Sequence, residues 1–445
     1  MVEVRPFRGL RFGAQAGSDL TALLSPPYDV LSPQDQESLH QRSPHNIVRL
    51  ELGKIGPQDT PEDNRYTRAR VLLSAWRREG VLLREEQPAF YLCRHRFQYL
   101  GVESTRWELL VQVRLAEWDE RVVLPHERTL PEPKVDRLNL LRALKTNTAP
   151  LWSLYSDPAA SLEALLQEQA RSAPLVEVPR WHEAAFDLWA INDPQQTEQI
   201  RRHIVASRLY MADGHHRYET ALAYRNEQRA AHPEASGEEG FNYVFMSLTS
   251  LSDPGLLILP IHRLVRGVSQ EQTEVLKRQL AAEWELESSK ASVSTLELDV
   301  RQALSQGRGD TPRFGVYGLE PGKLLLFRPR SLSDLQSRLS VAGSAALRSL
   351  DVTLLHEIVL HGYLAVGREA HQVEAALAFT HSAQEAVQHV DTGEYQLAFL
   401  VNPTRVEQVV TVADAGEKMP QKSTFFYPKL PVGLVLSPLE SHSPP

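Results

Sequence analysis

The sequence predicts an α/β (α+β) fold built on a mixed sheet with flanking helices. Two observations lead to this prediction. Amphipathic helical patterns and short runs of β-branched and aromatic residues are interspersed along the chain rather than separated into blocks. The composition, with 42% hydrophobic and 23% charged residues, is typical of a soluble globular protein. At 445 residues the chain is too long for one ordinary core, so we expect two or three domains.

The N-terminal half contains the clearest local signals. Ser32 followed by Pro33 predicts a helix start, because serine caps helices and proline suits the first helical position. Two runs at 89–99 and 106–115 are rich in aromatic and β-branched residues and predict neighbouring antiparallel strands. Further helices are expected at 66–79, 136–145, 161–171, 195–206 and 217–230, and further strands at 208–211 and 242–248.

The C-terminal half continues the same mixture, with helices expected at 270–285 and 351–365 and strands at 314–318, 323–328 and 395–401. The turn-rich stretch 233–240 predicts a flexible connection. We expect a composite N-terminal α/β domain at residues 1–265 that carries the active site. A C-terminal α/β region at 266–435 would pack on it, followed by a disordered tail at 436–445.

Composition and charge exclude several classes. The net charge of −8 argues against DNA or other bulk nucleic-acid binding, which usually needs a basic excess. The single cysteine, Cys93, excludes an intramolecular disulfide, and its strand-like surroundings predict a buried thiol. The N-terminus has no apolar signal segment, and no stretch approaches the roughly 18 apolar residues of a membrane span. We therefore expect a cytoplasmic protein without a membrane partner. The sequence does not indicate its oligomeric state.

The most informative segment is Asp-Gly-His-His-Arg at 213–217, between a short apolar run and an amphipathic helix pattern. A helix start presents backbone N–H groups and the positive end of the helix dipole, which suits an anion. Gly214 permits a tight turn and close approach of a ligand. Arg217 can hold a phosphate or carboxylate through two parallel hydrogen bonds. Asp213 can cap the helix, orient a histidine or bind a metal, but capping alone leaves His-His-Arg unexplained.

Two earlier turns also carry reactive side chains. Asp29 follows two prolines and a tyrosine, and the prolines preset a rigid backbone. His126 and Glu127 offer an acid/base pair or two metal ligands. Lys134 and Arg137 add positive charge where the next helix begins, which suits a phosphate. For both turns a solvated surface loop is the alternative interpretation.

Two segments of the C-terminal half add candidates. Arg263 follows a histidine at the end of an apolar run, where α/β proteins place ligand groups, although a structural role is equally open. Lys422 lies in a Gln-Lys-Ser-Thr run that resembles the end of a phosphate loop, but the glycines of such a loop are absent. A nucleotide P-loop is therefore excluded. The helical pattern at 351–361 contains His356 and a glutamate but lacks the second zincin histidine, so we interpret it as structural.

Together these segments resemble a widespread bacterial and archaeal family of uncharacterised proteins, domain of unknown function 1015 (DUF1015). The resemblance spans nearly the whole chain, and the order and spacing of its motifs make it specific. It implies a family without implying a function. The matching residues are 26–30, 125–127, Thr129, Lys134, 136–137, 212–218, Pro260, 262–263 and 419–424.

The turn at 213–217 by itself is similar to the Gly-His/Arg-Arg turn of the ParB/sulfiredoxin superfamily. Free-serine kinases of that fold carry a very similar Asp-Gly-His-His-Arg. This resemblance implies a ParB/sulfiredoxin-like core, elaborated here by insertions, whose turn holds nucleotide phosphates. Several members transfer a phosphoryl group to a small acceptor. The long insertion between Asp29 and Asp213 departs from the superfamily pattern.

The leading hypothesis is a nucleotide- or phosphate-binding enzyme, an ATP- or ADP-dependent phosphotransferase that uses magnesium. Its substrate would be a small polar metabolite, for example a hydroxy amino acid. Phosphoryl transfer needs positioning and charge neutralisation more than covalent chemistry. The residues expected to hold the cofactor are Gly214, His216, Arg217, Lys134, Arg137, Arg263 and Lys422. Those expected in catalysis are Glu127, Asp213, His215, His126 and Asp29, with Glu127 or Asp29 taking the acceptor hydroxyl proton.

Two alternatives remain. The first is a metal-dependent hydrolase in which His126, His215 and His216 bind a divalent ion together with an acidic residue. Adjacent histidines at a helix start point in different directions, which disfavours it. The second is a nucleotide-binding regulatory protein without turnover. The leading hypothesis also expects the segments around His126 and His215 to meet in one pocket.

Overall fold

The chain divides into two compact units. In this computed structural model, the described residues are 1–127, 132–289, 296–305, 311–340, 343–366 and 376–440. The first unit consists of residues 1–125, 129–256 and 428–445, and the second of residues 126–128 and 257–427. Residue 265, where the sequence places the predicted boundary, falls inside the second unit, and the last described residues return to the first. Thr129, which belongs to the family motif, lies outside the described residues.

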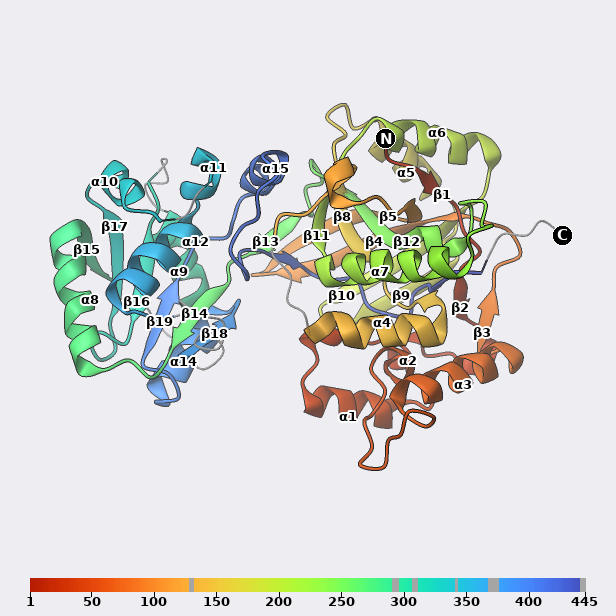
Figure 1. Cartoon of the computed structure of the whole chain (residues 1–445), viewed down its shortest axis with the longest axis horizontal. Helices are drawn as coiled ribbons and strands as arrows, with labels where there is room; N and C mark the ends of the chain where they lie inside the picture. The colour runs from red at the N-terminus through yellow and green to blue at the C-terminus, as the bar shows by residue number, and fades with distance from the viewer. Residues whose placement is uncertain (128–131, 290–295, 306–310, 341–342, 367–375, 441–445) are drawn as a thin grey trace. The chain divides into compact units, whose positions relative to one another are not determined.

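The first unit is built on a mixed sheet that, within the described residues, has nine strands (Figure 1). The pairs β6–β11 and β8–β12 are parallel, and the other pairs are antiparallel. The strand order is β6 (Val123–Leu124), β11 (Leu209–Asp213), β8 (Leu151–Tyr155), β12 (Tyr243–Ser250), β5 (Val102–Arg114), β4 (Phe90–Tyr99), β10 (Ala184–Ile191) and β9 (Val176–Trp181), with β1 (Val4–Arg5) beside β5. The predicted α/β class with a mixed sheet is confirmed.

Helices flank this sheet, as the sequence predicted. They are α1 (Pro33–Arg42), α2 (Val48–Glu51), α3 (Arg65–Arg78), α4 (Glu132–Leu144), α5 (Ser161–Gln169), α6 (Pro194–Val205) and α7 (His215–Ala231), with short 3-10 turns at Ala14–Ala16, Leu20–Ala22, Tyr28–Val30, Trp118–Glu120 and Gly240–Asn242. Ser32 caps α1 and Pro33 opens it, which confirms the predicted start. Helices α4 and α7 lie side by side, and α3 packs against α4 (Figure 1).

A buried ionic network joins strands β5 and β12 of this sheet. The Arg106 guanidinium donates to the Glu108 carboxylate, with the shortest N–O distance at 2.7 Å, and both side chains are at most 1% exposed. The Ser247 hydroxyl donates to the other Glu108 oxygen at 2.6 Å, and the Arg106 guanidinium also donates to the carbonyl of Pro428 at 2.6 Å. Burial raises the pKa of Glu108, but the Arg106 charge outweighs it and lowers the pKa to about 2. We call these three side chains the Arg106 network.

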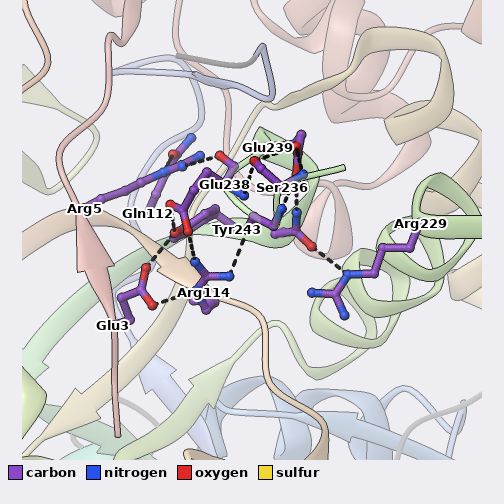
Figure 2. Close-up of polar contacts among 11 residues, drawn as sticks. Glu3, Arg5, Gln112, Arg114, Arg229, Ser236, Glu238, Glu239 and Tyr243 are labelled. Atoms are coloured by element: carbon purple, nitrogen blue, oxygen red, sulfur yellow. Dashed lines mark hydrogen bonds and ion pairs between the residues drawn. The ribbon is translucent and has the colours of Figure 1, made fainter. Parts of the chain in front are cut away.

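The connection between α7 and β12, which the sequence predicted to be flexible, is tied to the sheet (Figure 2). Within it, the Glu239 carboxylate accepts hydrogen bonds from the backbone and hydroxyl of Ser236 at 2.7 and 2.9 Å. The guanidinium groups of Arg5 and Arg114 lie 3.4 and 4.9 Å from the centre of the Tyr243 ring and donate to backbone carbonyls of the connection at 2.8 and 2.9 Å. Cation–π stacking and charge-assisted hydrogen bonds therefore hold this polar segment in place.

The second unit has an antiparallel sheet with six strands among the described residues (Figure 1). Their order is β15 (Trp284–Ser289), β17 (Leu324–Pro329), β16 (Phe314–Tyr317), β19 (Leu397–Leu400), β14 (His262–Val265) and β18 (Leu377–Thr380). A separate pair joins β13 (Leu257–Leu259) to β20 (Phe425–Tyr427). The helices are α8 (Gln270–Glu283), α9 (Leu296–Ser305), α10 (Leu332–Ser337), α11 (Ala345–Arg348), α12 (Asp351–Leu354), α14 (Ala383–Asp391) and α15 (Val406–Asp414).

The helix predicted at 351–365 changes its winding. After α12 the chain continues as a π-helix, η6 (Leu355–Tyr363). The amide of Leu364 donates to the carbonyl of Val359, five residues earlier, at 3.1 Å. The apolar side chains of this stretch are buried in the core of the second unit. Their spacing is compatible with either winding, so periodicity alone does not distinguish the two.

The final described residues are ordered parts of the first unit. Strand β21 (Ser437–Pro438) pairs with β7 (Thr146–Asn147), and Leu436 is fully buried. Residues 436–440 thus form structure where the sequence predicted a disordered tail, and residues 441–445 lie outside the described residues. A further small pair joins β2 (Leu10–Phe12) to β3 (Leu82–Arg84). Among the described helices, none has the length and apolar character needed to cross a membrane.

Candidate functional site

The predicted strand–glycine–helix turn is present. Strand β11 ends at Asp213, Gly214 has a left-handed backbone with φ of +94°, and α7 begins at His215. A Cβ atom added at Gly214 would lie 3.1 Å from both the Arg217 guanidinium and the Leu151 side chain. Glycine is therefore required for its backbone angle and for the close approach of these groups. The helix starts two residues before the predicted position, so both histidines belong to its first turn.

Four charged side chains gather at this turn, and we call them the Asp213 cluster: Asp29, Asp213, Arg217 and Lys429. The Lys429 ammonium contacts the carboxylates of Asp29 and Asp213 at 2.5 and 2.8 Å. The second oxygen of Asp213 accepts a hydrogen bond from Arg217 at 3.0 Å. The side chains of Lys429 and Arg217 are 11% and 15% exposed, whereas that of Asp29 is 38% exposed. The cluster thus pairs two cations with two carboxylates and leaves Asp29 the most accessible member.

The charges of this cluster stabilise one another. Burial would raise the pKa of Asp213, but the neighbouring Lys429 and Arg217 outweigh burial and hold it well below its usual range. Burial would lower the pKa of Lys429, but the two carboxylates outweigh it and raise that pKa. Both groups are therefore charged at neutral pH. His215, which is 8% exposed, also lowers the pKa of Asp213.

A second ionic group adjoins the cluster. The guanidinium of Arg137 lies 4.1 Å from the centre of the Tyr28 ring and contacts Glu51 at 3.2 Å and Asp136 at 2.5 Å. Asp136 also pairs with Arg65. A cavity of about 50 Å³ lies between this group and Arg217, which is enough for a few water molecules, since each needs roughly 10–15 Å³. Its lining residues are Glu51, Arg137, Leu140, Leu141, Thr146, Asn147, Thr148, Ala149, Leu151, Arg217 and Thr220.

The predicted basic residues of α4 have acidic partners in the structure. Arg137 is 6% exposed and forms ion pairs with Glu51 and Asp136. Lys134 forms an ion pair with Glu219 of α7. This pair joins the two helices that lie side by side. The cofactor role predicted for Lys134 and Arg137 stays a prediction.

The remaining predicted residues lie in the second unit. His126 and Thr424 form a hydrogen bond of 2.8 Å between Nε2 and the hydroxyl, and the Glu127 carboxylate accepts the backbone N–H of Lys422 at 2.8 Å. Two distant predicted segments, around residues 126 and 422, therefore come together. Because His126 and His215 belong to different units, a common pocket for them stays a prediction.

Arg263 is fully buried in the second unit. Its guanidinium donates to Nε2 of His356 at 3.1 Å and to the carbonyl of Lys422 at 2.9 Å. It also donates to the carbonyl of Ile261. Burial lowers the pKa of Arg263 to about 10, which leaves the side chain charged at neutral pH. His356 lies in the stretch 351–361, interpreted from the sequence as structural, and its hydrogen bond with the buried Arg263 is compatible with that interpretation.

The neighbouring His262 predicts a pH dependence of stability. Its Nδ1 atom accepts the backbone N–H of Val401 at 3.2 Å, and burial lowers its pKa to about 3. In the unfolded chain the His262 side chain takes up a proton near pH 6.5, whereas in the folded chain it does not. The contribution of neutral His262 to the free energy of unfolding is therefore present above pH 6.5 and is lost as the pH falls towards 3. We expect the free energy of unfolding to drop by about 2 kcal/mol between pH 7 and pH 5 from this group, measured by urea denaturation. His262→Asn should reduce that slope, and an unchanged slope would contradict the assignment.

The described residues contain no group of three or more histidine, cysteine, aspartate or glutamate side chains arranged to hold a metal ion. Lys429 is the main residue of this cluster that is absent from the expected cofactor-binding and catalytic sets. The sequence offers it only as one of several polar residues at 419–429 that could bind phosphate.

Several solved structures are similar to the chain at low identity. A conserved hypothetical protein from Pyrococcus furiosus has 13% identity and a TM-score of 0.32, covering 74% of this chain and 95% of its own. A free serine kinase mutant in complex with ADP has 12% identity and a TM-score of 0.33, covering 74% and 92%. SbnI from Staphylococcus aureus, truncated at its C-terminus, has 11% identity and a TM-score of 0.37, covering 75% and 90%.

No curated protein matches the sequence. The family profile described as protein of unknown function (DUF1015) matches residues 4–353, which is more than half of the chain. The predicted family resemblance is therefore confirmed. This protein belongs to the DUF1015 family.

Proposed function

We propose that the protein is a nucleotide- or phosphate-binding enzyme that transfers a phosphoryl group from ATP or ADP to a small polar metabolite. The observation that supports this proposal is the Asp213 cluster at the start of α7. Two cations, Arg217 and Lys429, lie where the first turn of a 17-residue helix presents its backbone N–H groups. Preorganised positive groups at a helix N-terminus suit phosphate oxygens and the charge that develops during phosphoryl transfer. The resemblance of the turn at 213–217 to the phosphate-holding turn of the ParB/sulfiredoxin superfamily also supports the proposal.

The carboxylates of the cluster suit magnesium. The Lys429 ammonium occupies the position on which the Asp29 and Asp213 oxygens converge, so a magnesium ion would bind a carboxylate of the cluster beside Lys429. Magnesium needs only one or two carboxylates besides the phosphates of its nucleotide. Bound there, it would neutralise charge on the phosphate oxygens, which the balanced cluster does not do alone. Asp213 is the residue that would hold it, which leaves Asp29 available to the acceptor hydroxyl.

Asp29 is the member best placed to accept the proton of an acceptor hydroxyl. Its side chain is 38% exposed, against 23% for Asp213, so a substrate can reach it. Lys429 fixes the position of its carboxylate. Geometry is the first requirement for a general base, and an oriented, accessible carboxylate meets it. Glu127, the other predicted base, stays a prediction in the second unit.

The direct test is the substitution Arg217→Ala. We expect nucleotide affinity to fall by about 10- to 100-fold, because a hydrogen bond to a charged group contributes roughly 1.5–3 kcal/mol. Isothermal titration of the full chain with ATP and with ADP, each with and without magnesium, measures this change. Phosphorus NMR of reactions with serine and other small hydroxylated acceptors measures the transfer itself.

Arg171→Ala is a matched control, because that side chain is 78% exposed on the first unit and should leave affinity unchanged. Failure of the wild-type protein to bind either nucleotide would refute the proposal. Binding without transfer to any acceptor would instead favour the regulatory alternative. Equal nucleotide affinities of the wild-type protein and Arg217→Ala would show that the nucleotide does not bind at this turn.

A further inference from the structure

A second cavity lies in the first unit, beside α1, α2, α3 and the loop between α2 and α3. Its volume is about 690 Å³, within the range of small-molecule sites. The sequence singled out none of its lining residues. They are His40, Arg49, Gly53, Lys54, Ile55, Gly56, Pro57, Gln58, Asp59, Asp63, Arg65, Arg68, Ala69 and Leu72.

The two aspartates of this lining, Asp59 and Asp63, form ion pairs with one arginine. Arg68 contacts Asp59 at 2.9 Å and Asp63 at 3.0 Å. Lys54, half of whose side chain is exposed, pairs with Glu37 at 2.5 Å. Arg65 pairs with Asp136. Among the described residues, Asp59 and Asp63 form ion pairs with Arg68 only, and together the three side chains carry one negative charge.

Arg49 is a lining cation that takes no part in these ion pairs. Its guanidinium donates to the backbone carbonyls of His40 at 2.5 Å and Ser43 at 3.3 Å. Within the part of the chain that the structure describes, Arg49 has no carboxylate partner, although it is half-buried. Carbonyl groups orient a guanidinium but do not cancel its charge, and a partly buried charge is costly without a counter-ion. An anion in the cavity would supply one.

The other walls of the cavity are apolar. Ala69 and Leu72 lie on the α3 side, and the loop contributes Ile55 and Pro57. The Ile55 side chain is 71% exposed, so it is accessible to a ligand in the cavity. A ligand with an apolar body would cover part of this surface.

We propose that this cavity binds a small organic anion, a carboxylate or a phosphate monoester with an apolar body, whose charge Arg49 neutralises. The site is separate from the Asp213 cluster and does not depend on the proposed phosphotransferase activity. Isothermal titration of the full chain with phenyl phosphate and with benzoate tests it and distinguishes the two anion classes. We expect at least one of them to bind in the millimolar range or tighter, and the neutral benzyl alcohol to bind at least tenfold more weakly.

Variants locate the binding. Arg49→Ala should weaken binding of the anion at least tenfold, and Arg49→Lys should restore part of it. Ile55→Asp changes an exposed side chain, so the fold should persist while affinity falls. Arg78→Ala, 74% exposed on α3 and outside the lining, and Arg217→Ala should both leave affinity unchanged. Absence of binding of both anions, or binding that survives Arg49→Ala and Ile55→Asp, would overturn the proposal.

Discussion

Replacement of Arg106 by methionine is expected to lower the free energy of unfolding by about 3–5 kcal/mol. Methionine fills similar space but leaves the Glu108 carboxylate, 1% exposed, without its cation. The carbonyl of Pro428 loses its donor as well. Urea denaturation followed by circular dichroism measures the change, and a loss below 1 kcal/mol would show that the network contributes little.

The double variant Arg106→Met with Glu108→Gln separates charge from packing. If the uncompensated carboxylate causes the loss, the double variant should be more stable than Arg106→Met alone, because the two effects are not additive. Arg96→Met serves as the surface control. Its side chain is 48% exposed and pairs with Asp187, which is buried but keeps its ion pair with Arg94. The loss expected for Arg96→Met is therefore small, about 0–1 kcal/mol.

The second large effect is expected for Lys429→Met. It removes the cation shared by Asp29 and Asp213 and leaves two carboxylates close together at the start of α7. We expect a loss of about 3 kcal/mol in the free energy of unfolding, at the lower end of the range for buried ion pairs because Asp29 is 38% exposed. Nucleotide affinity should fall with it if the proposed function holds. Urea denaturation and isothermal titration measure the two effects.

A second substitution tests the cause. Asp213→Asn in the Lys429→Met background should recover part of the stability by removing one of the two facing charges. It should not recover nucleotide affinity, since Arg217 would have lost the carboxylate that orients it. A Lys429→Met protein as stable as the wild type would show that the two carboxylates tolerate one another. Arg171→Met again provides the exposed control.

The sequence predicted what local patterns determine. The Ser32–Pro33 helix start, the antiparallel strands β4 and β5 and the turn at Gly214 all follow from short-range rules, and each is present. The buried thiol of Cys93 was predicted from its strand-like neighbours and is confirmed. These features depend on residues within a turn or two of one another, where propensity and periodicity are strongest.

Most of what escaped prediction depends on contacts between distant segments. Lys429 meets Asp29 across 400 positions of sequence, and no local pattern indicates that pairing. The stretch at 233–240 contains turn-forming residues, but its order comes from Arg5 and Arg114 on other strands. The π-helix that starts at Leu355 also escaped prediction, but for a local reason, because apolar spacing does not distinguish α from π winding. Ion pairs and long-range hydrogen bonds therefore decide the details of the site.

The return of the chain to the first unit at residue 428 has a consequence for how this protein is made. A ribosome that has synthesised residues 1–256 has produced most of that unit but neither Lys429 nor the strand that pairs with β7. Asp29 and Asp213 therefore lack their shared cation until residue 429 has been synthesised. The residues of the second unit, 126–128 and 257–427, are synthesised before Lys429, so its sheet can form before the first unit is complete. The first unit can therefore complete its fold only after residues 428–440 have been synthesised.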